Sequence, residues 1–269
     1  MAIELGSLKK GMNVKAPRLI VFGEEKIGKS TLGSQAPDPI FMNVEDGADY
    51  LNITRAFQKD GSVKSAAEAT YQDCCDIVSA LLYQPHDFKT LVVDTMDALE
   101  MKIIKGMLEE YNTVSLSDPK VKEFAYGGAH NMLASRVKFL LDGFDMLREQ
   151  RNMCIIVIVH SKVERVDDDP MDDAHLRHVF RLSGKVDGLV KDWADCIVLA
   201  RQNLYIKQED AGFGQKISKA IDGERFLCGG KSHAYSGGGR VTLPDRMPLS
   251  WEGFIEAFNT ALQNQQNNN

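Results

Sequence analysis

The sequence predicts an α/β protein built on a doubly wound, mainly parallel sheet that β-hairpins extend toward the C-terminus. Before about residue 200, short apolar runs alternate with segments of helical periodicity, which is typical of parallel sheets covered by helices. Several of these runs end in a polar or charged residue, at the edge where such sheets bind ligands. After residue 200 the apolar runs become short and turn-separated, which indicates hairpins.

The elements follow in order along the chain. We expect strands at 18–22, 39–44, 90–95, 154–159 and 195–199, and hairpin strands at 204–206, 217–220, 225–227 and 240–243. We expect helices from Ser30 and at 66–83, 98–111, 129–150 and 251–262, with a loop-rich insertion at 112–128 and a charged segment at 163–182. One domain is predicted over residues 1–262, with a polar leader at 1–17 and a disordered polar tail at 263–269.

Composition limits the class of protein. The chain has 269 residues, 43% of them hydrophobic, which suffices for one large domain. Its net charge of −6 gives no overall basic field, so any nucleic-acid contact must come from local patches or an oligomer. No signal peptide and no apolar run of the ~20 residues that span a membrane is evident. Five cysteines without a CxxC pair predict a reduced, cytoplasmic protein.

The stretch after the first strand carries the strongest motif. It reads Gly23-Glu24-Glu25-Lys26-Ile27-Gly28-Lys29-Ser30, followed by Thr31, and fits the phosphate-loop pattern. The glycines let backbone N–H groups face an anion, Lys29 places a charge at the β- and γ-phosphates, and Ser30 offers a hydroxyl to Mg²⁺. Since a strand precedes the loop and a helix follows it, nucleotide binding is favoured over a turn without a ligand.

Asp94 ends the apolar run 90–93. A carboxylate at the end of such a strand can hold Mg²⁺ opposite the Ser30 hydroxyl, usually through water. The alternative is a helix N-cap, because a helix is predicted to begin directly after it. We favour the metal role beside a phosphate loop.

Two further strand ends point to the same edge of the sheet. Glu45 follows the strand next in sequence to the phosphate loop and is the candidate general base that activates water. Asp46 competes for this role, and a solvated turn is the alternative reading. His160 ends the strand 154–159 and is a candidate sensor of the γ-phosphate, although a histidine there is often only structural. No histidine has ligand spacing with a cysteine, so no zinc site is predicted.

The order of these motifs resembles the RecA-like recombinase ATPases, and among them the short, core-only phage recombinases that anneal single strands, grouped with RecA-type AAA ATPase domains. The resemblance covers roughly residues 15–260. It rests on three segments: the strand 41–44 with Glu45-Asp46-Gly47, residues 91–99 around Asp94, and residues 155–162. In the last of these, His160 occupies the position at which recombinases often carry Gln. The Tyr126-Gly127-Gly128 turn and the segment from Leu182 to Asp195 also fit this group.

The resemblance implies ATP and Mg²⁺ as ligands, assembly into rings or filaments, and single-stranded DNA bound by loops that correspond to 112–128 and 161–180. A basic residue of a neighbouring subunit would complete the nucleotide site, and Lys231 and Arg240 are the candidates. A single-strand-binding protein is a possible partner at the family level. The second loop departs from the pattern, because it holds five aspartates where phosphate contacts need Lys or Arg. The flanking cations are the candidate DNA contacts: Lys162, Arg165, Arg177 and Arg181.

The motifs and this resemblance together imply an ATP-dependent recombinase that binds single-stranded DNA and promotes annealing or pairing of strands, coupled to ATP hydrolysis. Two alternatives share the phosphate loop: a small-molecule or nucleoside kinase, and a non-hydrolysing adaptor whose oligomer is ordered by nucleotide. The chain lacks the Asn-Lys-x-Asp guanine reader of GTPases and a Gly-x-Gly-x-x-Gly dinucleotide motif after a strand.

Overall fold

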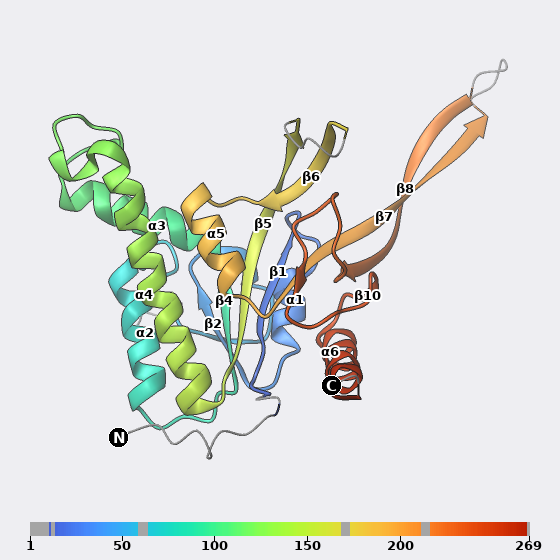
Figure 1. Cartoon of the computed structure of the whole chain (residues 1–269), viewed down its shortest axis with the longest axis horizontal. Helices are drawn as coiled ribbons and strands as arrows, with labels where there is room; N and C mark the ends of the chain where they lie inside the picture. The colour runs from blue at the N-terminus through green and yellow to red at the C-terminus, as the bar shows by residue number, and fades with distance from the viewer. Residues whose placement is uncertain (1–10, 12–13, 59–63, 168–172, 211–215, 268–269) are drawn as a thin grey trace.

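The computed structural model describes residues 11, 14–58, 64–167, 173–210 and 216–267. Within them one ten-stranded sheet runs in the order β10-β8-β7-β1-β5-β4-β2-β3, with β6 paired to β5 and β9 to β7 (Figure 1). The central strands β1 (Arg18–Gly23), β5 (Cys154–Val166), β4 (Thr90–Asp94) and β2 (Pro39–Asn43) are parallel. The predicted doubly wound, mainly parallel α/β sheet with C-terminal hairpins is therefore confirmed.

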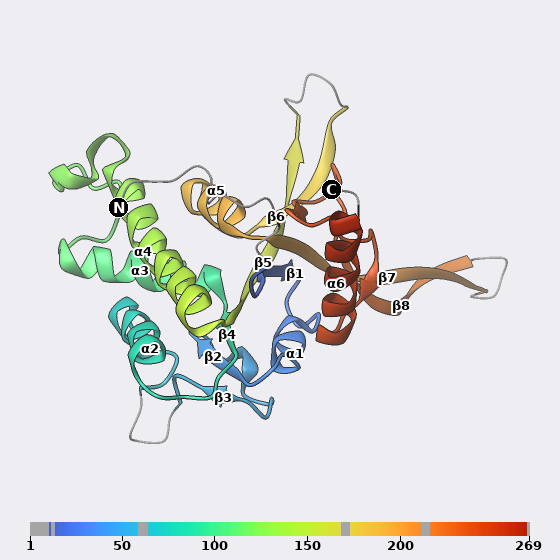
Figure 2. The same cartoon turned by 60° about the horizontal axis from the view of Figure 1, so that its bottom comes forward.

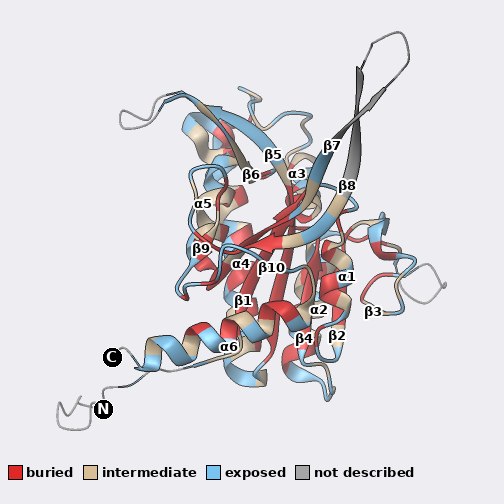
Figure 3. Ribbon diagram, turned by 90° about the vertical axis from the view of Figure 1, so that its right-hand side faces the viewer, coloured by how far each residue is buried: buried red, intermediate tan, exposed pale blue. Residues whose placement is uncertain are grey.

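Helices cover both faces of the sheet, and their sides follow from the two-residue period of the strands. One face packs its alternate strand residues, such as Ile20, Val93 and Val157, against the larger group of helices. These are α2 (Tyr71–Tyr83), α3 (Met96–Glu110), α4 (Gly128–Arg151) and α5 (Gly184–Trp193). The other face packs residues such as Val21 and Ile158 against α1 (Lys29–Ser34) and α6 (Trp251–Asn267), as Figure 2 shows. The strands between the layers are almost wholly buried (Figure 3).

Several boundaries differ from the sequence prediction for local reasons. Helix α2 begins at Tyr71, not at residue 66, because Thr70 and Asp73 form a capping box that starts it there. The predicted disordered tail is wrong for residues 263–267, which continue α6. Gln265 donates its side-chain N–H to the carbonyl of Arg240 at 3.1 Å, and glutamine is a good helix former.

The charged segment after the central strand forms a hairpin. Strand β5 continues past its buried part to Val166 and pairs antiparallel with β6 (His175–Phe180). Of the five aspartates in this segment, Asp167 and Asp173 belong to the described residues. The other three fall within 168–172, outside the described residues. Strand β6 has no apolar alternation, so the sequence pattern could not predict it.

The C-terminal runs merge into one long ribbon. Strands β7 (Cys196–Asp210) and β8 (Lys216–Cys228) pair from Leu199–Cys228 to Asp210–Lys216, with an irregularity between Gln202 and Leu204. Short strands β3 (Thr54–Arg55), β9 (Gly238–Gly239) and β10 (Met247–Pro248) complete the sheet. Two 3₁₀ helices, η2 (Asp46–Ala48) and η3 (Lys122–Gly127), lie in the connections. In Figure 1 η3, the β5–β6 hairpin and the β7–β8 ribbon extend from the same end of the molecule.

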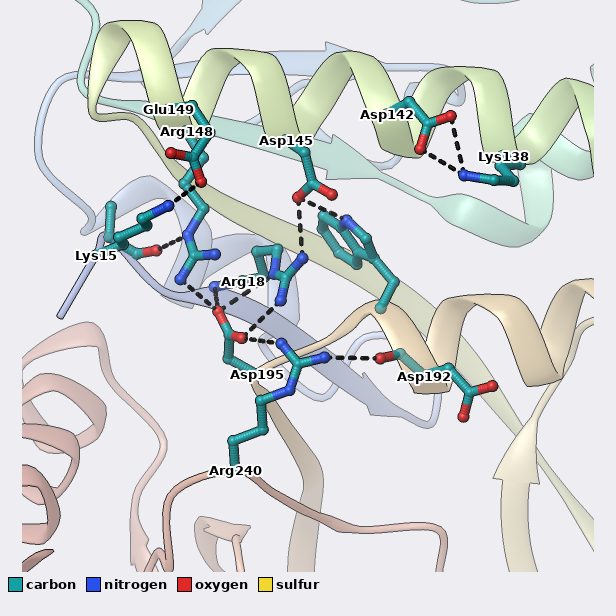
Figure 4. Close-up of polar contacts among 12 residues, drawn as sticks. Lys15, Arg18, Lys138, Asp142, Asp145, Arg148, Glu149, Asp192, Asp195 and Arg240 are labelled. Carbon is teal, nitrogen blue, oxygen red and sulfur yellow. Dashed lines mark hydrogen bonds and ion pairs between the residues drawn. The ribbon is translucent and has the colours of Figure 1, made fainter. Parts of the chain in front are cut away.

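At the opposite end, where the parallel strands begin, a buried carboxylate joins three arginines (Figure 4). Asp195 accepts from Arg18 at 2.8 Å, from Arg148 at 2.9 Å and from Arg240 at 2.6 Å. Asp145 takes a further bond from Arg18 at 3.0 Å and one from the indole N–H of Trp193. Burial opposes ionisation of Asp195, but its bonds to Arg18 and the nearby charges outweigh this and lower its pKa. The network ties α4 to β1 and β7.

Candidate active site

The strand ends named above meet at one edge of the sheet. Gly23 lies opposite His160 of β5 and opposite Ala200 of β7, and Asn43 lies opposite Asp94. The loops that follow β1 and β2 therefore open beside Asp94 and His160. This is the ligand-binding edge that the parallel topology predicts.

A cavity of about 580 Å³ occupies this edge. It is lined by phosphate-loop residues, by residues at or just after the ends of β2, β4 and β5, and by Arg181: Glu25, Lys26, Gly28, Lys29, Ser30, Thr31, Glu45, Asp46, Gly47, Tyr50, Leu51, Asp94, Thr95, His160 and Arg181. The ring of Tyr50 is fully exposed at its rim, next to Leu51, and offers an apolar surface to a nucleobase. The volume suits a ligand of nucleotide size.

Lys29 is held inside the phosphate loop. Its ammonium donates to the carbonyls of Gly23 at 2.9 Å and Glu24 at 2.6 Å. Burial lowers the pKa of Lys29 to about 8, while the charge of Asp94 opposes that change. Gly28 has a φ of 116°, a left-handed conformation that the loop requires and that glycine adopts without strain. The amine is thus positioned by the loop backbone next to the buried acids.

Asp94 and Ser30 fit a magnesium site. The carboxylate is 2% exposed, Ser30 hydrogen-bonds to it, and its Oδ2 has no partner among the described residues. Burial raises its pKa, because no cation fully compensates the charge. One carboxylate and one hydroxyl beside a phosphate site are the protein ligands that Mg²⁺ usually takes. Asp94 is also not the N-cap of α3, a position that Thr95 fills by accepting from Ala98 N–H.

Glu45 lies half-buried directly before η2, and Asp46 is exposed beside it on the same cavity wall. Burial raises the pKa of Glu45, the charge of His160 opposes this, and Asp94 and Asp97 raise it further. A carboxylate whose pKa moves toward neutrality is the better proton acceptor at physiological pH. Glu45 therefore remains the candidate base, with Asp46 beside it as the alternative.

His160 belongs to a buried cluster that sequence reasoning missed. Its backbone N–H donates to Asp97 Oδ1 at 3.0 Å, and its ring Nδ1 lies 2.9 Å from Asp97 Oδ2. Arg181 adds two bonds to the same oxygen, from Nε at 3.2 Å and from Nη2 at 2.8 Å. Burial would raise the pKa of Asp97, but the bonds from His160 and Arg181 hold it well below its usual range.

A family model described as an AAA domain matches residues 15–241, which is most of the chain. The chain belongs to the AAA-domain family of P-loop ATPases. A comparison with curated proteins gives no match. No helix in the described part of the chain is long and apolar enough to cross a membrane.

In the sequence of this AAA ATPase, the one feature that could have pointed to Asp97 is its distance from Asp94. Asp94 and Asp97 are three residues apart, and the second acid starts a helix, where a carboxylate is normally solvated and stabilises the helix dipole. Here it is 7% exposed and faces His160. Only the packing of α3 against β5 distinguishes the two cases.

The remaining predicted residues lie elsewhere. Lys162 pairs with Glu164 at 2.7 Å and Arg165 with Asp167 at 2.6 Å on the β5–β6 hairpin, and half-buried Arg177 lies on β6. Arg181, grouped with them as a DNA contact, has its side chain in the ATPase cavity instead. Two further candidates remain. Lys231 is exposed after β8, while Arg240 is bound to Asp195 of its own chain.

Proposed function

We propose that this AAA ATPase binds single-stranded DNA and promotes annealing or pairing of strands, with ATP hydrolysis controlling the DNA-binding state. One observation carries the proposal. The β5–β6 hairpin leaves the sheet at His160 and returns at Arg181, and both residues line the nucleotide cavity. A hairpin whose two ends touch the nucleotide site can respond to the state of the bound nucleotide.

The site residues divide the hydrolysis step among them. Lys29 and the loop N–H groups hold the β- and γ-phosphates, and Glu45 takes a proton from water as its oxygen attacks the γ-phosphorus. The bond from that phosphorus to the bridging oxygen breaks, and ADP leaves with the electron pair. Ser30 and Asp94 would hold Mg²⁺, which would neutralise negative charge on the phosphate oxygens. His160 contacts the γ-phosphate side of the cavity and passes its state to β5.

Surfaces suited to DNA extend from the same end as the nucleotide site. Tyr126 of η3 is fully exposed, so its ring is available for stacking on an unpaired base. On the hairpin, Lys162, Arg165 and Arg177 are the candidate phosphate contacts. Because Lys162 and Arg165 already pair with neighbouring acids, DNA must displace those ion pairs, which predicts modest affinity with a strong salt dependence.

We further propose a homo-oligomer, a ring or filament, in which a neighbour supplies a cation to the cavity. Lys231 suits this role better than Arg240, because Lys231 is exposed whereas Arg240 is engaged with Asp195. A single-strand-binding protein remains a proposed partner.

The test uses purified protein and a fluorescent oligonucleotide at low salt. We expect binding of single-stranded DNA to be stronger with ATP than with ADP, annealing of complementary strands to be accelerated, and ATP turnover to rise with single strands. Duplex DNA of equal length is the control. Turnover stimulated by a metabolite and indifferent to DNA would support a kinase instead, and bound nucleotide without turnover would support an adaptor.

A further inference from the structure

Arg181 lies where the hairpin rejoins the nucleotide cavity. It directly follows β6, and its backbone N–H donates to the carbonyl of His160 at 2.8 Å. This bond fixes the main chain of Arg181 beside the strand end that faces the cavity. The long side chain, in contrast, is 48% exposed and has room to reorient.

Its guanidinium is bound by two acids, Asp97 and Glu25, and its Nη2 also lies 2.9 Å from His160 Nδ1. Asp97 binds Nε and Nη2 with a carboxylate that is only 8% exposed. Glu25 of the phosphate loop binds Nη1 at 3.1 Å, but this pair is between two half-exposed side chains. An exposed pair of this kind contributes little to stability. Nη1 is therefore the nitrogen of Arg181 that can exchange Glu25 for an incoming anion.

The cavity lining carries more acidic than basic side chains, so a bound phosphate would need a further cationic N–H donor. Among the described lining residues four are carboxylates (Glu25, Glu45, Asp46, Asp94) and three are cations (Lys26, Lys29, Arg181). Of these cations only Arg181 carries several N–H nitrogens, so that one can donate to a phosphate oxygen while the others stay with Asp97. A triphosphate adds negative charge that the cavity does not yet balance.

We propose that Arg181 acts within its own chain as a catalytic arginine that exchanges Glu25 for the γ-phosphate of bound ATP. Asp97 retains Nε and Nη2, while Nη1 donates to a γ-phosphate oxygen and stabilises the charge that develops there as the bond to the bridging oxygen breaks. Because ADP has no γ-phosphate, Arg181 returns to Glu25 after release of phosphate. The inference rests on the proposed ATP hydrolysis at this site.

Three variants test it: Arg181→Gln, Arg181→Lys and the control Arg246→Gln. Arg246 is a fair match, because it is 46% exposed, pairs with the single carboxylate Glu224 and does not line the cavity. For each variant, affinities for ADP and for a β,γ-imido analogue of ATP are measured together with kcat. Melting temperatures show whether each variant is folded.

For Arg181→Gln we expect kcat to fall by about 100-fold or more, as when one transition-state donor is lost. Analogue affinity should fall about tenfold with ADP affinity within about twofold of wild type. Arg181→Lys, which keeps the charge, should lie between, and Arg246→Gln should match wild type. Equal weakening of ADP and analogue, or unchanged kcat and affinities, would overturn the proposal. If wild type binds ATP without hydrolysing it, the proposed ATPase activity fails, yet the difference between ADP and analogue still decides whether Arg181 contacts the γ-phosphate.

Discussion

Asp97 holds His160 by two bonds at once, one to its backbone N–H at 3.0 Å and one to its ring Nδ1 at 2.9 Å. The first bond places the strand end and the second sets the direction of the ring. Nδ1 also lies 2.9 Å from Arg181 Nη2, and His160 lines the cavity. The same carboxylate also anchors Arg181, so one buried acid positions two residues at the nucleotide site.

Replacing Asp97 should therefore impair catalysis more than nucleotide binding. In Asp97→Asn the His160 ring and the Arg181 fork lose their common charged acceptor. We expect kcat to fall by about 10- to 100-fold, as for loss of a residue that orients a catalytic group, with ADP affinity within about threefold. Asp142→Asn, which removes an exposed acid paired with Lys138 on α4, is the control. Normal turnover in Asp97→Asn would exclude the positioning role.

Asp94 gives a prediction that separates metal binding from folding. Its buried carboxylate has a raised pKa and an unpartnered oxygen, so the charge is unfavourable until a cation binds. In Asp94→Asn the Mg²⁺ concentration for half-maximal turnover should rise by about tenfold or more. Without Mg²⁺ the melting temperature of the variant should equal or exceed that of wild type. A variant that melts lower and keeps its Mg²⁺ dependence would contradict the assignment.

The Asp195 cluster should be essential for stability. Breaking a buried ion pair leaves the partner charges uncompensated and typically costs about 3–5 kcal/mol. Asp195→Asn would leave Arg18, Arg148 and Arg240 without their shared acceptor. We expect a loss of that size in the free energy of unfolding, measured in urea, against about 0.5 kcal/mol or less for Asp142→Asn. Equal losses would show that the cluster adds nothing beyond a surface pair.

The same cluster predicts a pH dependence. The pKa of Asp195 is lower in the folded protein than in the unfolded chain, where it is about 3.9. Its contribution to stability is therefore complete above about pH 5 and is lost as the pH falls below about 4. The raised pKa values of Asp94 and Glu45 change stability with pH in the opposite direction. The pH dependence of wild-type stability alone therefore does not isolate the contribution of Asp195. The difference in stability between wild type and Asp195→Asn should shrink on acidification. A constant difference would mean that the pKa of Asp195 is the same in the folded protein and in the unfolded chain.

The sequence predicted the sheet and the residues at its binding edge because those depend on local patterns. A phosphate loop between strand and helix, and acids after apolar runs, locate Lys29, Ser30, Glu45, Asp94 and His160, and all five line one cavity. The positions of Asp97 and Arg181 at the site could not be predicted, because they depend on packing between α3, β5 and β6. The extension of β5 and the strand β6 could not be predicted either, because their polar residues show no hydrophobic period.

We propose that this cavity hydrolyses ATP with Glu45 as the base. The most direct measurement is ATP turnover and ATP affinity in Glu45→Gln, beside wild type and Lys29→Ala. Glutamine keeps the size of Glu45 but cannot accept the proton, so affinity should stay within about twofold while turnover falls by about 100-fold or more. Lys29→Ala should lose turnover and bind ATP weakly. Turnover at the wild-type rate in Glu45→Gln would contradict the account and transfer the role to another group, with Asp46 the next to test.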